Sequence, residues 1–109
     1  MFSIGFAMKL KPGCYGQYKE AHDNLWPGVA QSMSENSINM VIFKFKIGDD
    51  LILHATAPTE EDWNRSREHP ALPEWQKAMT ELLQDDDQGN VIFEPLEVAF
   101  EFGEFINPT

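Results

Sequence analysis

Basic side chains are scarce in this chain of 109 residues. It has 8 Lys and Arg and 18 Asp and Glu, which gives a formal net charge of −10. This charge repels phosphate backbones and anionic lipid head groups, so we expect no nucleic-acid partner and no membrane partner. A strongly anionic substrate is also disfavoured, unless local charge opposes the overall field.

Cysteine is almost absent as well. Cys14 is the only one, which excludes an internal disulfide and a cysteine-based metal cluster. The first eight residues are apolar, but no basic region precedes them, and Lys9 follows too early for a signal peptide or a membrane span. We therefore expect a cytoplasmic protein whose apolar N-terminus is a buried strand.

The chain is rich enough in apolar residues to build a core. Hydrophobic residues make up 42% of the sequence and aromatic residues 12%, which excludes a disordered acidic tail. The length suits one compact domain over residues 1–109. The acidic residues are concentrated at the C-terminal end, because eight follow from Glu81 onward with no Lys or Arg.

Strand-like stretches alternate with helical periodicity along the sequence. The predicted elements are a strand over 2–10, a helix over 14–35, strands over 38–46 and 51–57, a helix over 60–68, a helical segment over 72–83, and a strand over 96–105. Pro27 either kinks the first helix or starts a second segment, and Thr59 is the expected N-cap of the next helix. The order β-α-β-β-α-β predicts a ferredoxin-like α+β fold, in which helices cover one face of an antiparallel sheet.

The other face of that sheet needs a cover. In the strand over 38–46, Met40 and Ile42 share one face, whereas Val41, Phe43 and Phe45 share the other. Because so small a domain has few elements left to bury a second apolar face, we expect a homodimer that packs sheet against sheet.

Most motifs that bind metals or cofactors are missing. There is no glycine-rich phosphate loop, no nucleophile elbow and no pair of histidines on one helix. His22, His54 and His69 are scattered, and the run Asp85 to Asp87 is typical of a solvated loop. We therefore predict neither a metal nor a cofactor.

Three side chains on the first helix suggest a binding site. Tyr18, His22 and Trp26 are spaced four residues apart, so they lie on one helix face. A phenol, an imidazole and an indole in a row could bind a neutral polyol. Trp63 and Trp75, on either side of the break at His69-Pro70, could form the opposite wall. In both cases, packing in the core is the alternative interpretation.

The same residues carry a family resemblance. The run from Phe6 to Gly13, followed by Tyr18, His22 and Trp26-Pro27 at fixed spacing, resembles the L-rhamnose mutarotase family. Supporting matches lie further along the chain, at Asn39, 61–64, His69-Pro70, Trp75, Met79 and 95–100.

The resemblance implies a dimeric α+β barrel protein that interconverts sugar anomers without metal or coenzyme. It assigns His22 as the proton donor and Tyr18 as a residue that contacts the substrate. Three positions depart from the family pattern. Met40 replaces a tyrosine, Gln76 replaces the second member of a tryptophan pair, and Gly28 replaces a glutamate. These changes affect the substrate wall and leave the acid/base residue in place.

The leading hypothesis is thus a mutarotase acting on L-rhamnose or a similar 6-deoxy aldose. His22 is the general acid/base, and Tyr18 is a hydrogen-bonding or second proton-transfer partner. The expected substrate-binding residues are Trp75, Gln76 and Met40, and Trp63 and Trp26, which either line the site or pack beneath it. One alternative is a cofactor-independent monooxygenase, against which the lack of an evident hydrophobic cavity argues. The other is a non-catalytic sugar-binding module.

Overall fold

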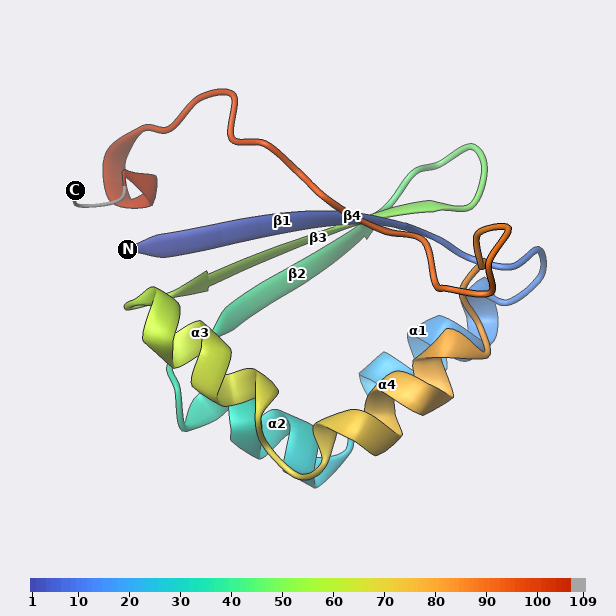
Figure 1. Cartoon of the computed structure of the whole chain (residues 1–109), viewed down its shortest axis with the longest axis horizontal. Helices are drawn as coiled ribbons and strands as arrows, with labels where there is room; N and C mark the ends of the chain where they lie inside the picture. Colours follow the sequence, from blue (N-terminus) through green and yellow to red (C-terminus); the bar gives the residue numbers. More distant parts are fainter. Residues whose placement is uncertain (107–109) are drawn as a thin grey trace.

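A four-stranded antiparallel sheet carries all four α-helices on one of its faces (Figure 1). The computed structural model describes residues 1–106. The strands are β1 (Phe2–Lys9), β2 (Asn39–Lys44), β3 (Asp50–Ala57) and β4 (Phe93–Pro95), in the sheet order β2-β3-β1-β4. The helices are α1 (Tyr15–Asp23), α2 (Pro27–Ser34), α3 (Glu60–Arg67) and α4 (Leu72–Thr80), and a short 3-10 helix η1 spans Gly103–Phe105. The predicted ferredoxin-like α+β fold is confirmed.

The core lies between the helices and the two central strands. β1 and β3 pair over eight residues, with Phe6 opposite Leu53 and Met8 opposite Leu51. Alternate residues of each strand point to the same face, so Met8, Leu51 and Leu53 point toward the helices and are buried. Met40 and Ile42 of β2 share this face, as predicted, and Val41 and Phe43 lie on the opposite one.

The chain breaks its first helical stretch at Pro27. Trp26 adopts an extended backbone (ψ 135°), as the residue before a proline prefers, and Pro27 is the first residue of α2. Of the two predicted outcomes, Pro27 therefore starts a second helix. Gly28 follows at a crowded point, because an added Cβ would lie 2.7 Å from the Cβ of Ala71.

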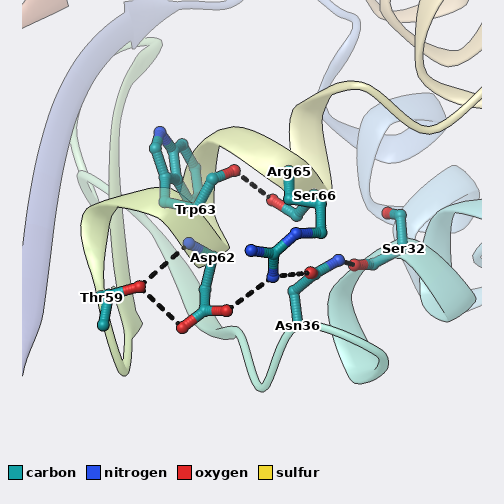
Figure 2. A network of polar contacts seen from close by, with 7 residues as sticks. All are labelled: Ser32, Asn36, Thr59, Asp62, Trp63, Arg65 and Ser66. Atoms are coloured by element: carbon teal, nitrogen blue, oxygen red, sulfur yellow. Dashed lines mark hydrogen bonds and ion pairs between the residues drawn. The ribbon is translucent and has the colours of Figure 1, made fainter.

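A polar network joins α3 to the end of α2 (Figure 2). Thr59 caps α3 as predicted, since its Oγ1 accepts the Asp62 N–H at 3.2 Å. Arg65 Nη1 donates to Asp62 Oδ1 at 2.8 Å and to Asn36 Oδ1 at 3.2 Å. The buried Asn36 in turn donates to the carbonyl oxygen of Ser32. The bond between Arg65 and Asn36 is the one in this network that links α3 to the end of α2.

Two predicted boundaries are wrong. α4 ends at Thr80, whereas the apolar pattern predicted helix through Leu83. Leu83 is buried because it bridges to Leu10 of the chain beside β1, so its apolarity reflects a strand-like contact. The apolar pattern correctly predicted that Leu83 is buried, but it did not distinguish a helix from a strand-like bridge.

The last predicted strand, over 96–105, is also wrong. β4 spans only Phe93–Pro95, and the Leu96 N–H donates one further bond to the carbonyl oxygen of Gly5. Alternating apolar and polar residues indicate which side chains favour burial. A strand also requires hydrogen bonds to the backbone of a neighbouring strand. Among residues 1–106 no strand pairs with the chain beyond Leu96, and Phe100 and Phe102 are 82% and 78% exposed.

The sheet face opposite the helices is partly open. Val41 and Phe43 are 41% and 59% exposed there. The segment 96–106 runs over this face near the N-terminal end of β1 (Figure 1). Leu96 touches the backbone at Gly5, and the Phe105 ring lies 5.5 Å from the His54 ring. Among the described helices, none has the length and apolarity needed to cross a membrane.

Candidate active site

A cavity of about 750 Å³ lies between the sheet and the helices. Its volume is within the range of small-molecule sites. All four described α-helices contribute residues to one side, and residues of β1, β2 and β3 contribute the other. The predicted site residues that line it are Tyr18, His22, Met40, Trp63, Trp75 and Gln76.

His22 is oriented by the main chain one turn earlier. Its Nδ1 lies 2.8 Å from the carbonyl oxygen of Tyr18. A carbonyl oxygen only accepts hydrogen bonds, so Nδ1 carries the proton and the Nε2 of the neutral ring has a free lone pair. Among residues 1–106, Nε2 has no hydrogen-bond partner. The ring thus presents a base to the cavity.

Tyr18 places a neutral phenol beside this imidazole. The two ring centroids are 4.3 Å apart, and Tyr18 is 5% exposed. Burial disfavours the phenolate and raises the pKa of Tyr18 to about 12. No described residue hydrogen-bonds the hydroxyl, so it is available to a ligand as a donor.

Trp75 forms the wall next to His22. The edge-to-face contact between these rings has a centroid distance of 5.0 Å. Trp26 packs edge-on against Trp75 at 5.3 Å, but it is 39% exposed and is not among the residues that line the cavity. The three residues predicted to lie in a row therefore have different positions. Tyr18 and His22 line the cavity, whereas Trp26 packs against the indole of Trp75.

Trp63 lines the cavity from α3, and the side chain of Arg67 lies over one face of its ring. The guanidinium carbon of Arg67 lies 5.3 Å from the Trp63 ring centroid. Trp63 is buried, and Met40 is half-buried on β2. Gln76, next to Trp75 on α4, is exposed at the cavity wall.

The cavity is mainly apolar, contrary to the expectation that this chain has no hydrophobic cavity. The apolar lining comes from both layers and includes Phe6, Met8, Val29, Ile42, Leu51, Leu53, Leu72 and Met79. Phe6 and Met8 lie in the N-terminal stretch that the sequence predicted as a buried strand. Because a core residue and a cavity-lining residue share the same periodicity, the sequence did not separate them.

Arg67, Tyr15 and Lys44 are cavity residues that sequence reasoning missed. Arg67 follows Trp63 by four residues, which places both on one face of α3. Tyr15 precedes His22 by seven residues and so lies two turns earlier on the same face of α1. These helical spacings were the available signals for Arg67 and Tyr15, and the strand alternation that puts Lys44 on the face of Met40 was the signal for Lys44.

The remaining histidines lie outside this cavity. His54 is on β3 and contacts Phe105 on the open sheet face. His69 Nδ1 accepts the Ala71 N–H at 3.1 Å and so stabilises the turn between α3 and α4. Within residues 1–106, no three His, Cys, Asp or Glu side chains are grouped so that they could hold a metal ion.

Fold and site together define a small α+β protein of ferredoxin-like topology in which an imidazole and a phenol line one cavity. The model of the L-rhamnose mutarotase family matches residues 3–102. The chain belongs to this family, and it is an isomerase.

Individual relatives agree with the family match. The chain is 25% identical to the L-rhamnose mutarotase of Mannheimia succiniciproducens and 26% identical to that of Clostridium beijerinckii, in each case over 92% of this chain and 97% of the relative. A crystal structure of an L-rhamnose mutarotase from Formosa agariphila has a TM-score of 0.75 at 24% identity, and the match covers 94% of this chain and all of that one.

The fold is also shared more widely. A candidate antibiotic biosynthesis monooxygenase from Nitrosomonas europaea has a TM-score of 0.66 at 14% identity, over 92% of this chain and all of that one. At this identity the likeness concerns the fold alone, and it carries no argument about activity.

Proposed function

We propose that this protein interconverts the α and β anomers of L-rhamnose or a similar 6-deoxy aldose. The observation that carries the proposal is the pair formed by His22 and Tyr18. The bond from Nδ1 to the Tyr18 carbonyl leaves Nε2 as a base, and a neutral phenol lies beside it in a cavity suited to a small molecule. The family to which the chain belongs supports the same reaction.

The reaction needs two proton transfers. Nε2 of His22 removes the proton of the anomeric hydroxyl, and the imidazolium delivers that proton to the ring oxygen as the bond between the ring oxygen and the anomeric carbon breaks. The open-chain aldehyde rotates about the bond next to the carbonyl carbon, and the transfers reverse as the ring closes. An imidazole is suited to both directions near neutral pH, and a positioned acid/base typically contributes about 10²–10⁴-fold.

The structure favours His22 as the proton carrier and Tyr18 as a hydrogen-bond donor. A phenol whose pKa is raised to about 12 gives up its proton reluctantly near neutral pH. It can still donate a hydrogen bond to a sugar oxygen and hold that oxygen beside the imidazole. Of the two roles predicted for Tyr18, we therefore propose the hydrogen-bonding one.

Trp75 is the proposed platform for the C–H face of the sugar. It lies beside His22 and is supported from behind by Trp26. Met40 and Gln76 complete the wall, and the amide of Gln76 offers a donor and an acceptor to hydroxyl groups. Trp63 lies further along the cavity, where it supports Arg67.

We also propose that the protein is a cytoplasmic homodimer joined through the open face of its sheet. The exposed Val41 and Phe43 would be covered by the partner, and the exposed Phe100 and Phe102 of segment 96–106 would extend across the same interface. An exposed apolar surface of this kind is typical of protein–protein contacts.

Exchange NMR on the anomeric protons tests the proposal. We expect the purified protein to accelerate exchange between the anomers of L-rhamnose above the rate in buffer. His22→Ala should lower the catalysed rate by about 10²–10⁴-fold. His69→Asn is the matched control, because it removes another imidazole while the asparagine oxygen can still accept the Ala71 N–H.

The two alternatives give different results in the same preparation. A monooxygenase would consume oxygen with an electron-rich aromatic substrate, which the apolar lining of the cavity could accommodate. A non-catalytic module would bind sugars saturably without accelerating exchange. Unaccelerated exchange for L-rhamnose and for a panel of 6-deoxy aldoses and hexoses would reject the proposed function.

A further inference from the structure

The charges around the cavity oppose the charge of the whole protein. The chain has a net charge of −10. Among the described residues, the charged side chains that line the cavity are Lys19, Asp23, Lys44 and Arg67, three cations and one carboxylate. A local positive excess attracts anions to the cavity, although the protein as a whole is acidic.

Two of the three cations are already engaged. Lys19 Nζ forms an ion pair with Asp23 at 2.9 Å, which also neutralises the only carboxylate of the lining. Lys44 Nζ donates to the carbonyl oxygen of Phe45 at 2.8 Å and lies 5.2 Å from the Tyr15 ring centroid.

Among residues 1–106, Arg67 and Lys44 both lack an ion pair, and Arg67 also lacks a described hydrogen bond. Its described contact is the one with the face of Trp63, at 5.3 Å. Its neighbour Arg65, two residues earlier on α3, instead pairs with Asp62. Partial desolvation lowers the pKa of Arg67, although a guanidinium stays protonated at physiological pH. Arg67 is exposed to solvent at the cavity wall, so its five N–H donors are open to a ligand.

The geometry points to a carboxylate-bearing aldose as a substrate of this site. We propose that the cavity accepts hexuronates, and that it prefers at least one of them to the uncharged hexose of the same ring configuration, because Arg67 binds the carboxylate. The planar fork of a guanidinium matches the two oxygens of a carboxylate. The cation–π contact with Trp63 favours a placement of the guanidinium at the cavity before a carboxylate binds.

This inference rests on the proposed anomerisation and adds a substrate class to it. In a hexuronate the carboxylate is on carbon 6, away from the anomeric carbon, so the same ring opening proceeds at His22 while Arg67 binds the other end. No new bond is formed or broken. Arg67 acts on specificity and takes no part in proton transfer.

The test compares matched sugar pairs by anomeric exchange NMR. The pairs are D-galacturonate with D-galactose and D-glucuronate with D-glucose, beside L-rhamnose as the uncharged reference. For at least one pair we expect the hexuronate to have the higher kcat/KM. A hydrogen bond between charged groups is strong enough that Arg67→Gln should lower this preference about 10- to 100-fold, with L-rhamnose exchange changed less than about threefold.

Two further variants separate charge from packing. Arg67→Lys keeps the charge but not the fork, so it should retain part of the preference for hexuronates. Arg65→Gln removes a guanidinium from the same helix outside the cavity and should leave the preference unchanged.

The outcomes distinguish this inference from the proposed function. Exchange of L-rhamnose together with equal or slower exchange of both hexuronates relative to their hexoses overturns the role of Arg67 and leaves the mutarotase proposal intact. The same holds if Arg67→Gln slows charged and uncharged sugars equally. Absence of accelerated exchange for every sugar rejects both.

Discussion

The Nδ1 of His22 lies 2.8 Å from the main-chain carbonyl oxygen of Tyr18, its neighbour one helical turn earlier. A single turn of α1 therefore sets the orientation and the tautomer of the candidate base, and it places the phenol of Tyr18 against the same ring. No second side chain is needed to orient the imidazole, as a carboxylate does in many acid/base sites.

This relationship predicts opposite tautomers for two histidines. Neutral His22 should be protonated at Nδ1, because that atom donates to a carbonyl oxygen. His69 should be protonated at Nε2, because its Nδ1 accepts the Ala71 N–H at 3.1 Å. Nitrogen-15 chemical shifts of the labelled protein, measured at a pH where both rings are neutral, report each tautomer. Finding His22 protonated at Nε2 would contradict the proposed direction of proton transfer.

Tyr18 predicts a loss of stability at alkaline pH. Its pKa is about 12 in the folded protein and about 10 in the unfolded chain, so between these values the folded state binds more protons. Stability is then fully present below pH 10 and falls by up to about 1.4 kcal/mol per pH unit as the pH rises toward 12. Urea unfolding across this range should show the fall, and Tyr18→Phe should remove the part that Tyr18 contributes.

The titration of the phenol itself provides the control. Ultraviolet difference spectra of the folded wild type and Tyr18→Phe should differ by one tyrosinate that forms about two pH units above a model tyrosine. A Tyr18 that ionises near pH 10 in the folded protein would remove the basis for treating it as a neutral donor.

The crowding at Gly28 predicts that Gly28→Ala and Gly16→Ala have different effects on the stability of the protein. Gly28→Ala would place a Cβ 2.7 Å from the Cβ of Ala71, and overpacking of this kind costs about 1–3 kcal/mol. Gly16→Ala is the matched control, because Gly16 is likewise the second residue of its helix and an added Cβ there meets nothing within 4 Å. We expect Gly16→Ala to be neutral or to stabilise by up to about 1 kcal/mol.

Thermal and urea unfolding of both variants measure this difference. The double variant Gly28→Ala, Ala71→Gly should recover part of the lost stability, since it removes the atom that the new Cβ meets. Equal effects of the two glycine substitutions would show that the α2 turn adjusts without strain.

Phe43 predicts the oligomeric state. Phe43→Glu would place a carboxylate in the proposed sheet-to-sheet interface, where burying an unpaired charge costs several kcal/mol. Light scattering after gel filtration should show a dimer for the wild type and a monomer for the variant. Ile47→Glu at the β2–β3 hairpin, where Ile47 is 91% exposed, should leave the dimer unchanged. A monomeric wild type would refute the proposed interface.

Local patterns predicted much of the fold from the sequence. The three-to-four spacing around Tyr18 and His22, the backbone restriction at Pro27 and the cap at Thr59 are dictated within a few residues, and the structure confirms the elements that follow from them. The alternation in β2 likewise assigned Met40 and Phe43 to opposite faces. The same alternation failed beyond Leu96, because pairing depends on a partner backbone that local sequence does not specify.

The sequence by itself determined the kinds of element, their order and the row of polar aromatic residues on α1, because backbone preferences and side-chain periodicity act over one or two turns. Only the tertiary structure decided which of those residues meet. It placed Trp26 behind Trp75 and brought Arg67 to the same cavity as His22, since these relationships depend on how helices distant in sequence pack over one sheet. The net charge of −10 likewise did not predict the charge at the cavity. Folding brings three cations to its lining in a chain that is acidic overall.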